Sequence, residues 1–181
     1  MRADGIVHVP LDEQELKEIA STLKAANIDC VAVCFLHSHA FPEHEERAAE
    51  ILRKNMPDEV SIMTSSMVYP EFREYERFST TGLNAALLTV MNAYLDRLTK
   101  GVAEKGVAAE PTISQSGGGL MSATYSRRYP IRSALSGPAA GVLGAAYRAK
   151  ATNEANVITL DIGGTSADVS LLANGEPSVV H

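Results

Sequence analysis

Six small or polar residues in one short segment near the carboxyl end of the chain have the chemistry to bind a phosphate group and a divalent cation. They are Asp161, Gly163, Gly164, Thr165, Ser166 and Asp168. Apolar runs of strand length lie on both sides of this segment, so the sequence predicts a β-hairpin over Val157–Leu172 with Gly163–Ser166 at its tip. Glycines can adopt positive φ and let a ligand approach the backbone, and exposed backbone N–H groups in a turn attract anions.

The two aspartates of this hairpin carry the oxygen ligands that hydrated Mg²⁺ prefers. Asp161 ends the first strand, where its carboxylate could hold the metal or a metal-bound water, and it is our candidate catalytic residue. The pattern favours a hairpin that holds a nucleotide phosphate. An ordinary tight hairpin, which uses glycine and aspartate for turn geometry alone, stays open as the alternative.

Two further segments could contribute to a nucleotide site. A glycine triplet containing Gly118 and Gly119 follows an expected strand over 111–116, and either a flexible loop or a loop beside a nucleotide explains it. Ser136 or Gly137 is the expected N-cap of a helix that reaches Ala149 and packs closely through Gly141 and Gly144. Because a helix N-terminus attracts anions, Ser136 and Gly137 are candidate phosphate-binding residues.

The remaining pattern predicts an α/β fold in which a mixed sheet carries flanking helices. Strands are expected at 6–9, 30–36 and 60–64, and helices at 11–26, 42–55 and 80–105. The segment 71–77 is dense in charge, and its acid–base pairs are typical of a solvated helix face.

Composition excludes several classes of protein. The net charge of −6 argues against a general nucleic-acid binder, and no apolar run approaches the length that a membrane span needs. The two cysteines, Cys30 and Cys34, lie four residues apart on an expected strand, beyond disulfide reach, and indicate reduced core residues in a cytoplasmic protein. His37, His39 and His44 lack the further ligands that a zinc site needs.

Five motifs, in this order along the chain, resemble the hydantoinase A/5-oxoprolinase family. They are VAVCFLHS at 31–38, PEFREYER at 70–77, QSGGGLM at 115–121, LSGPAAGV at 135–142 and the hairpin at 161–168. The hairpin also resembles the phosphate hairpin of actin-like and sugar-kinase-like ATPases, so the resemblance implies part of an actin-like (ribonuclease H-like) fold. It also implies that residues 1–135 form the C-terminal part of the family's N-terminal domain and that residues 136–181 form the beginning of its ATPase domain. For the charged segment 71–77, it implies the alternative that part of the segment is a structural anchor near the active cleft.

This resemblance implies an ATP- and Mg²⁺-dependent enzyme that opens a small cyclic amide after phosphorylating its carbonyl, together with a separate or fused B-type subunit. Family members carry two phosphate hairpins, and only the later one is present here, so we expect an internal piece that is inactive alone. Unpaired strand edges in such a piece could be covered by a second copy, giving a homo-oligomer. Two alternatives stay open: a subunit of an ATP-dependent ketone carboxylase, and a non-catalytic actin-like nucleotide-binding regulator.

Overall fold

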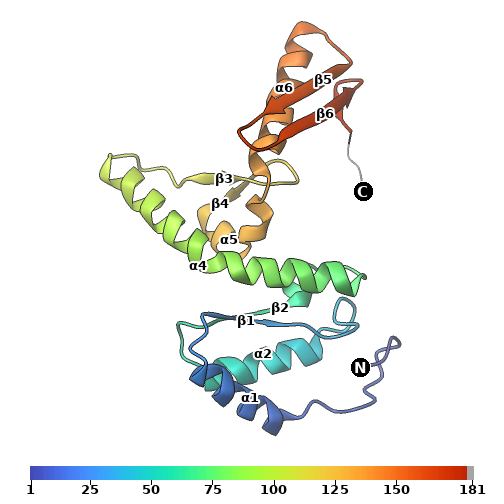
Figure 1. Cartoon of the computed structure of the whole chain (residues 1–181), viewed down its shortest axis with the longest axis vertical. Coiled ribbons are helices and arrows are strands. Elements are labelled where there is room, and N and C mark those ends of the chain that lie inside the picture. The colour runs from blue at the N-terminus through green and yellow to red at the C-terminus, as the bar shows by residue number, and fades with distance from the viewer. Residues whose placement is uncertain (179–181) are drawn as a thin grey trace. The chain divides into compact units, whose positions relative to one another are not determined.

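The protein folds into two compact units, seen in a computed structural model that describes residues 1–178 (Figure 1). The first unit is Met1–Tyr94 and the second begins at Leu95. The division falls within the 31-residue helix α4 (Glu74–Glu104). The expected boundary between family domains after residue 135 stays a prediction, and residues 179–181 of the expected second domain lie outside the described residues.

The first unit contains a pair of parallel strands with helices on both sides. Strands β1 (Cys30–Val33) and β2 (Ser61–Thr64) run parallel and pair along their whole length, with Cys30 opposite Ser61 and Val33 opposite Thr64. Helices α1 (Glu13–Ala25) and α2 (Glu43–Asn55) lie on one side of the pair, and the first half of α4 lies on the other (Figure 1). The short helix α3 (Ser65–Val68) follows β2 directly. The core is formed by aliphatic residues of α1, β1, α2 and β2, among them Leu16, Val33, Ile51, Leu52 and Ile62.

The second unit is built from two small antiparallel sheets and a long helix. Its elements after α4 are β3 (Thr112–Ser114), β4 (Leu120–Ser122), α5 (Ala123–Arg128), a 3₁₀ turn (Pro130–Ser133), α6 (Ser136–Thr152), β5 (Val157–Ile162), β6 (Ala167–Ala173) and β7 (Glu176–Pro177). Strands β5 and β6 form the predicted hairpin, with Val157 opposite Leu172 and Ile162 opposite Ala167. Helix α6 lies along this hairpin (Figure 1).

The α/β class is confirmed, but several expected details are wrong. Residues 6–9 form no strand, because they lie exposed with no neighbouring strand to pair with. The apolar run at 30–36 is a strand only as far as Val33. The mixed sheet is instead three separate sheets, one parallel and two antiparallel. Within the described residues, no helix combines the length and the apolar character needed to cross a bilayer.

The start of α6 also differs from the expectation. Its N-cap is Leu135, in the left-handed region with φ of 57°, and Ser136 is already helical. The missing N–H of Pro138 falls within the first four residues, whose N–H groups have no helical acceptor, so the helix can begin two residues before the proline. The expected close packing through Gly141 and Gly144 is wrong, since a Cβ at either position would meet nothing within 4 Å.

A buried polar network lies where β1 and β2 end. Arg77 and Glu45 are both fully buried and are joined through the hydroxyl of Ser65. That hydroxyl donates to Glu45 Oε1 at 2.6 Å and accepts from Arg77 Nε at 3.1 Å. The burial of Arg77 corrects the expectation that 71–77 forms only a solvated helix face.

The same network binds the backbone of the segments that follow both strands, which are the loop after β1 and the helix α3 after β2. Glu45 accepts from the backbone N–H groups of Phe35 (2.7 Å) and Ser66 (2.8 Å). Arg77 donates to the carbonyls of Phe35 (3.0 Å) and Glu71 (2.7 Å).

The thiol of Cys34 lies next to this network. Its burial, and to a smaller extent the charge of Glu45, raises the pKa of this thiol to about 11, so the cysteine stays protonated near neutral pH.

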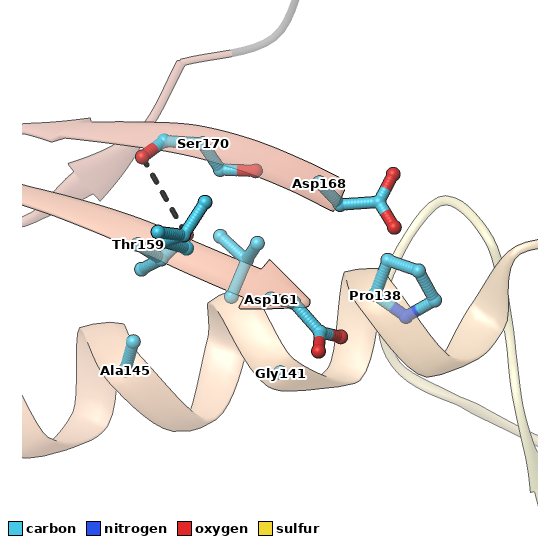
Figure 2. A pocket seen from close by; sticks show the side chains of 9 residues that line it. Pro138, Gly141, Ala145, Thr159, Asp161, Asp168 and Ser170 are labelled. Carbon is cyan, nitrogen blue, oxygen red and sulfur yellow. Dashed lines mark hydrogen bonds between the residues drawn. The ribbon is translucent and has the colours of Figure 1, made fainter. Parts of the chain in front are cut away.

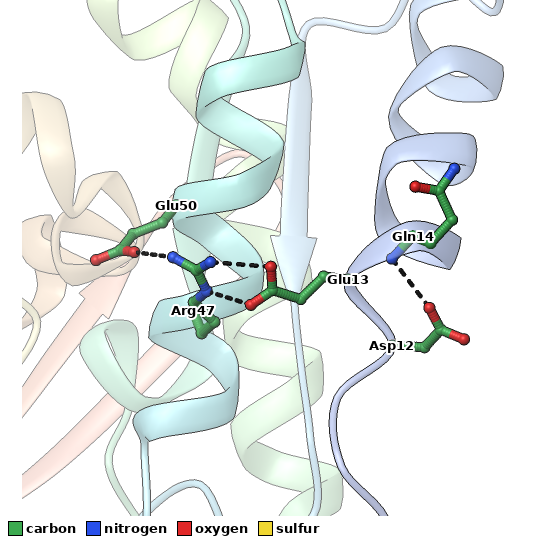
Figure 3. Close-up of polar contacts among 5 residues, drawn as sticks. All are labelled: Asp12, Glu13, Gln14, Arg47 and Glu50. Atoms are coloured by element: carbon green, nitrogen blue, oxygen red, sulfur yellow. Dashed lines mark hydrogen bonds and ion pairs between the residues drawn. The ribbon is translucent and has the colours of Figure 1, made fainter.

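Helices α1 and α2 are joined by an exposed ion pair of two parallel hydrogen bonds (Figure 3). The Arg47 guanidinium donates to both carboxylate oxygens of Glu13, at 2.7 and 2.9 Å, and to Glu50 at 3.1 Å. The hydrogen bond from Arg47 holds the pKa of the Glu13 carboxyl below its ordinary value. Asp12 caps the first turn of α1 by accepting from the N–H groups of Gln14 and Glu15.

We predict that Arg77→Met lowers the free energy of unfolding by about 3–5 kcal/mol, because it leaves the Glu45 charge buried beside a neutral side chain. Arg73→Met is the matched control, since Arg73 lies just before the same helix with its side chain 77% exposed, and it should cost less than about 0.5 kcal/mol. Urea unfolding of both variants measures the difference. Equal, small losses would show that the buried charge is not the source of stability.

We also predict that Arg47→Gln raises the pKa of Glu13 toward its ordinary value. The pKa of Glu13 is lower in the folded protein than in the unfolded chain. The ion pair with Arg47 therefore stabilises the folded protein at pH values above the unfolded-state pKa, and this stabilisation is lost as the pH falls through the folded-state pKa. The stability difference between wild type and Arg47→Gln should therefore be present at neutral pH and vanish in acid. NMR titration of the Glu13 carboxyl and unfolding at several pH values test both statements.

Candidate functional site

A cavity of about 410 Å³ lies between α6 and the β5–β6 hairpin, and both candidate metal ligands line it (Figure 2). From α6 it is lined by Pro138, Gly141, Val142 and Ala145, and from the hairpin by Thr159, Leu160, Asp161, Asp168 and Ser170. The structure therefore brings Asp161 and Asp168 together beside the first turns of a helix, where the positive end of the helix dipole favours negative charge.

Asp161 and Asp168 face each other directly across the two strands. Two like charges at such a position repel each other unless a cation or a donor lies between them. Within residues 1–178, no hydrogen bond or ion pair reaches either carboxylate, and no lysine or arginine lines the cavity. Within these residues, the repulsion between the two carboxylates is therefore not offset.

The donor atoms of the cavity fit magnesium. Its polar side chains are two carboxylates and two hydroxyls, and Mg²⁺ prefers such oxygen ligands. Among the described residues there is no cluster of three or more acidic, histidine or cysteine side chains able to enclose a metal by itself. A magnesium ion here would keep several waters or share phosphate oxygens, as it does in many nucleotide sites.

The tip of the hairpin presents a row of unpaired backbone donors. The N–H of Gly163 donates to the Ser166 carbonyl at 2.9 Å, and this bond closes the turn. The next three N–H groups, those of Gly164, Thr165 and Ser166, have no hydrogen-bond acceptor within the described part of the chain. All of these residues are exposed, so the turn is a concavity of donors that an anion can reach.

The two glycines of this turn are not required by the backbone. Neither has positive φ, contrary to the expectation that they use this freedom, and a Cβ at Gly164 would meet nothing within 4 Å. Alanine would therefore fit both positions in the unliganded turn. The space beside Gly164 is open, as a close approach of a ligand to the backbone would require.

Gly118 and Gly119 have a structural explanation. Their φ angles are +85° and +79°, values that L side chains rarely adopt, and they form the turn between β3 and β4. A Cβ on Gly118 would lie 3.4 Å from Leu143 of α6. The loop lines a separate cavity of about 190 Å³ on α6, with Ala140 and Leu143, and does not reach the one that holds the aspartates.

Ser136 and Gly137 lie in the first turn of α6 but do not line the cavity, which begins at Pro138. The sequence interpretation missed Thr159 and Ser170. Their signal is the two-residue period of a strand, which places them on the same face as Asp161 and Asp168. It also missed the α6 wall formed by Gly141, Val142 and Ala145.

Models of two regions of one protein family match most of the chain. The Hydantoinase/oxoprolinase N-terminal region matches residues 1–56, and Hydantoinase/oxoprolinase matches residues 77–181. The caprolactamase subunit alpha of Pseudomonas jessenii is 35% identical over 96% of this chain and 25% of its own length. The 5-oxoprolinase of Saccharomyces cerevisiae is 35% identical over 91% of this chain and 12% of its own.

Two solved structures share the fold. The ATP-dependent caprolactamase from Pseudomonas jessenii superposes with a TM-score of 0.84 at 35% identity, over 94% of this chain and 25% of that one. A nucleotide-free acetone carboxylase superposes with a TM-score of 0.79 at 30% identity, over 93% of this chain and 24% of that one. The chain spans about a quarter of the length of three relatives that match nearly all of it.

We predict that Asp168→Asn stabilises the metal-free protein by about 0.2–1 kcal/mol, because it removes the repulsion across the hairpin. Glu176→Gln is the control, since Glu176 lies in the same sheet opposite Ala173 and has no facing charge. Thermal unfolding in EDTA measures both. A loss of stability in Asp168→Asn would show that the carboxylate has a partner within the protein.

Proposed function

Because the chain belongs to the hydantoinase/oxoprolinase family, we propose that it forms part of the ATP site of an enzyme that opens small cyclic amides. The observation that carries the proposal is the row of three unpaired backbone N–H groups at the hairpin tip, next to two unpaired carboxylates. A phosphate chain bound to Mg²⁺ offers oxygen atoms to the first and a cation to the second.

Each candidate residue then has a role. The N–H groups of Gly164, Thr165 and Ser166 and the hydroxyls of the last two donate to phosphate oxygens, with Gly163 closing the turn. Asp161 and Asp168 hold Mg²⁺, directly or through water, and the metal supplies positive charge that offsets the charge developing during phosphoryl transfer. Ser136 and Gly137 contribute the positive end of α6, while Gly118 and Gly119 keep the β3–β4 loop close to that helix.

The names of two relatives support cyclic amides as the substrate class: one is a caprolactamase subunit and another a 5-oxoprolinase, each 35% identical to this chain. Water would then attack an amide carbonyl that phosphorylation has activated. The second candidate is ATP-dependent ketone carboxylation, because the acetone carboxylase beta subunit and the acetophenone carboxylase gamma subunit are also relatives, at 29% and 31% identity. Activity assays with a lactam and with a ketone plus bicarbonate separate the two.

Several relatives are named as subunits, which supports a partner protein for this one. We propose a B-type subunit, separate or fused, that completes the active site. Neither cysteine is in a disulfide, which agrees with a reducing compartment, and we propose a cytoplasmic location.

We predict that Asp161→Asn in the complete polypeptide lowers ATP turnover by roughly 100-fold or more while the fold is kept. Glu176→Gln, on the same sheet but outside the cavity, should retain wild-type turnover. Steady-state phosphate release measures both, and circular dichroism checks the fold. Wild-type turnover in Asp161→Asn would refute its catalytic role.

A pair of glycine variants tests whether the cavity itself is the ligand site. Gly141→Leu should fill the cavity and abolish Mg-ATP binding by the complete polypeptide, yet it should stabilise α6, since leucine is a better helix former than glycine. Gly144→Leu changes the same helix outside the cavity and should bind normally. Calorimetric titration gives the affinities. Unimpaired binding in Gly141→Leu would exclude this cavity as the nucleotide site.

The 181-residue chain alone should bind Mg-ATP weakly or not at all, because one hairpin offers few hydrogen-bond donors to the phosphates.

A further inference from the structure

The first unit holds a second and larger cavity, of about 620 Å³, which lies within the size range of small-molecule pockets. It is formed by Met1, by the residues just before α1, by the first turn of α1, by the segment 35–41 between β1 and α2, and by His44 in the first turn of α2. Its walls are mainly apolar, from Val9, Leu11, Phe35, Leu36 and Phe41. None of these residues belongs to the proposed ATP site.

Three polar side chains also line the cavity, and two of them are acidic. Asp12 caps α1 with one carboxylate oxygen, Oδ1, so its second oxygen stays available. Within the described residues, neither the carboxylate of Glu15 nor the imidazole ring of His44 has a hydrogen bond or an ion pair. The nearby Arg47 is bound to Glu13 and Glu50 and does not line the cavity. Met1, which carries the α-amino group of this chain, also lines the cavity, so the lining offers two negative charges and one positive charge next to apolar surface.

The walls are held in place by the fold. The backbone N–H of Phe35 is bound by Glu45, and its carbonyl is bound by Arg77 and Ser38. Phe41 donates its N–H to the His37 carbonyl at 3.0 Å. A cavity with such fixed walls costs little to organise when a ligand binds. The side chain of Leu36 is 59% exposed.

We propose that this cavity binds a small ligand with an apolar body and one positive charge, an alkyl- or arylammonium compound. The apolar walls would bury the hydrocarbon part, and the carboxylates of Glu15 and Asp12 would pair with the ammonium group. The same charges disfavour an anion. A metal ion is disfavoured because the acidic and histidine side chains do not cluster closely enough to hold one in the described structure.

NMR titration of the 181-residue chain with 2-phenylethylammonium tests the proposal, and 2-phenylethanol is a neutral probe of similar shape. We expect saturable shifts of the backbone amides of Leu11, Phe35 and Leu36, with the ammonium compound bound roughly two- to fivefold more tightly than the alcohol. Glu15→Gln should remove this preference. Glu18→Gln, on the same helix but outside the cavity, should keep it.

Three results would overturn the proposal: no saturable shift at these residues, equal affinities for the two probes in the wild type, or a preference that persists in Glu15→Gln. Shifts of the same amides on dilution of the chain without a probe would show that a second copy occupies the cavity, and would also overturn it. Thermal unfolding of both variants confirms that they remain folded. Because the cavity shares no residue with the ATP site, its test is independent of the proposed function.

Discussion

The first unit depends on one buried guanidinium. Arg77, at the start of α4, meets Glu45 of α2 through the hydroxyl of Ser65, and the three groups together bind the backbone where β1 and β2 end. Removing two charges from water costs several kcal/mol for each, and only a complete set of hydrogen bonds offsets this. With the set complete, the backbone of the loop after β1 and the first turn of α3 after β2 are both bound to buried side chains.

Parts of the structure governed by local rules were predictable from the sequence. The hairpin over 157–172 was expected in position, because apolar runs of strand length flank a turn of small and polar residues. The helices at 11–26 and 42–55 were also expected from spacing. The burial of Arg77 was not, since a charged segment looks solvated until the chain brings Glu45, 32 positions earlier in the sequence, beside it.

The candidate site shows the same division. Asp161 and Asp168 could be paired from the sequence, because strand register follows from the apolar runs. The α6 wall could not, because no local signal states which helix face meets the sheet. The glycines also illustrate the difference: those at 118 and 119 are explained by positive φ, while those at 163 and 164 are explained only by the space that they leave.

The bridging hydroxyl in the buried network also limits how this sequence can change over time. Ser65 is fully buried and touches both charged partners, so an arginine or a glutamate lost alone leaves its counterpart as an isolated charge in the core. Replacement of the set by apolar side chains of similar volume can be neutral, but the route passes through a strongly destabilised single mutant. The positions 45, 65 and 77 are therefore expected to be exchanged together or not at all.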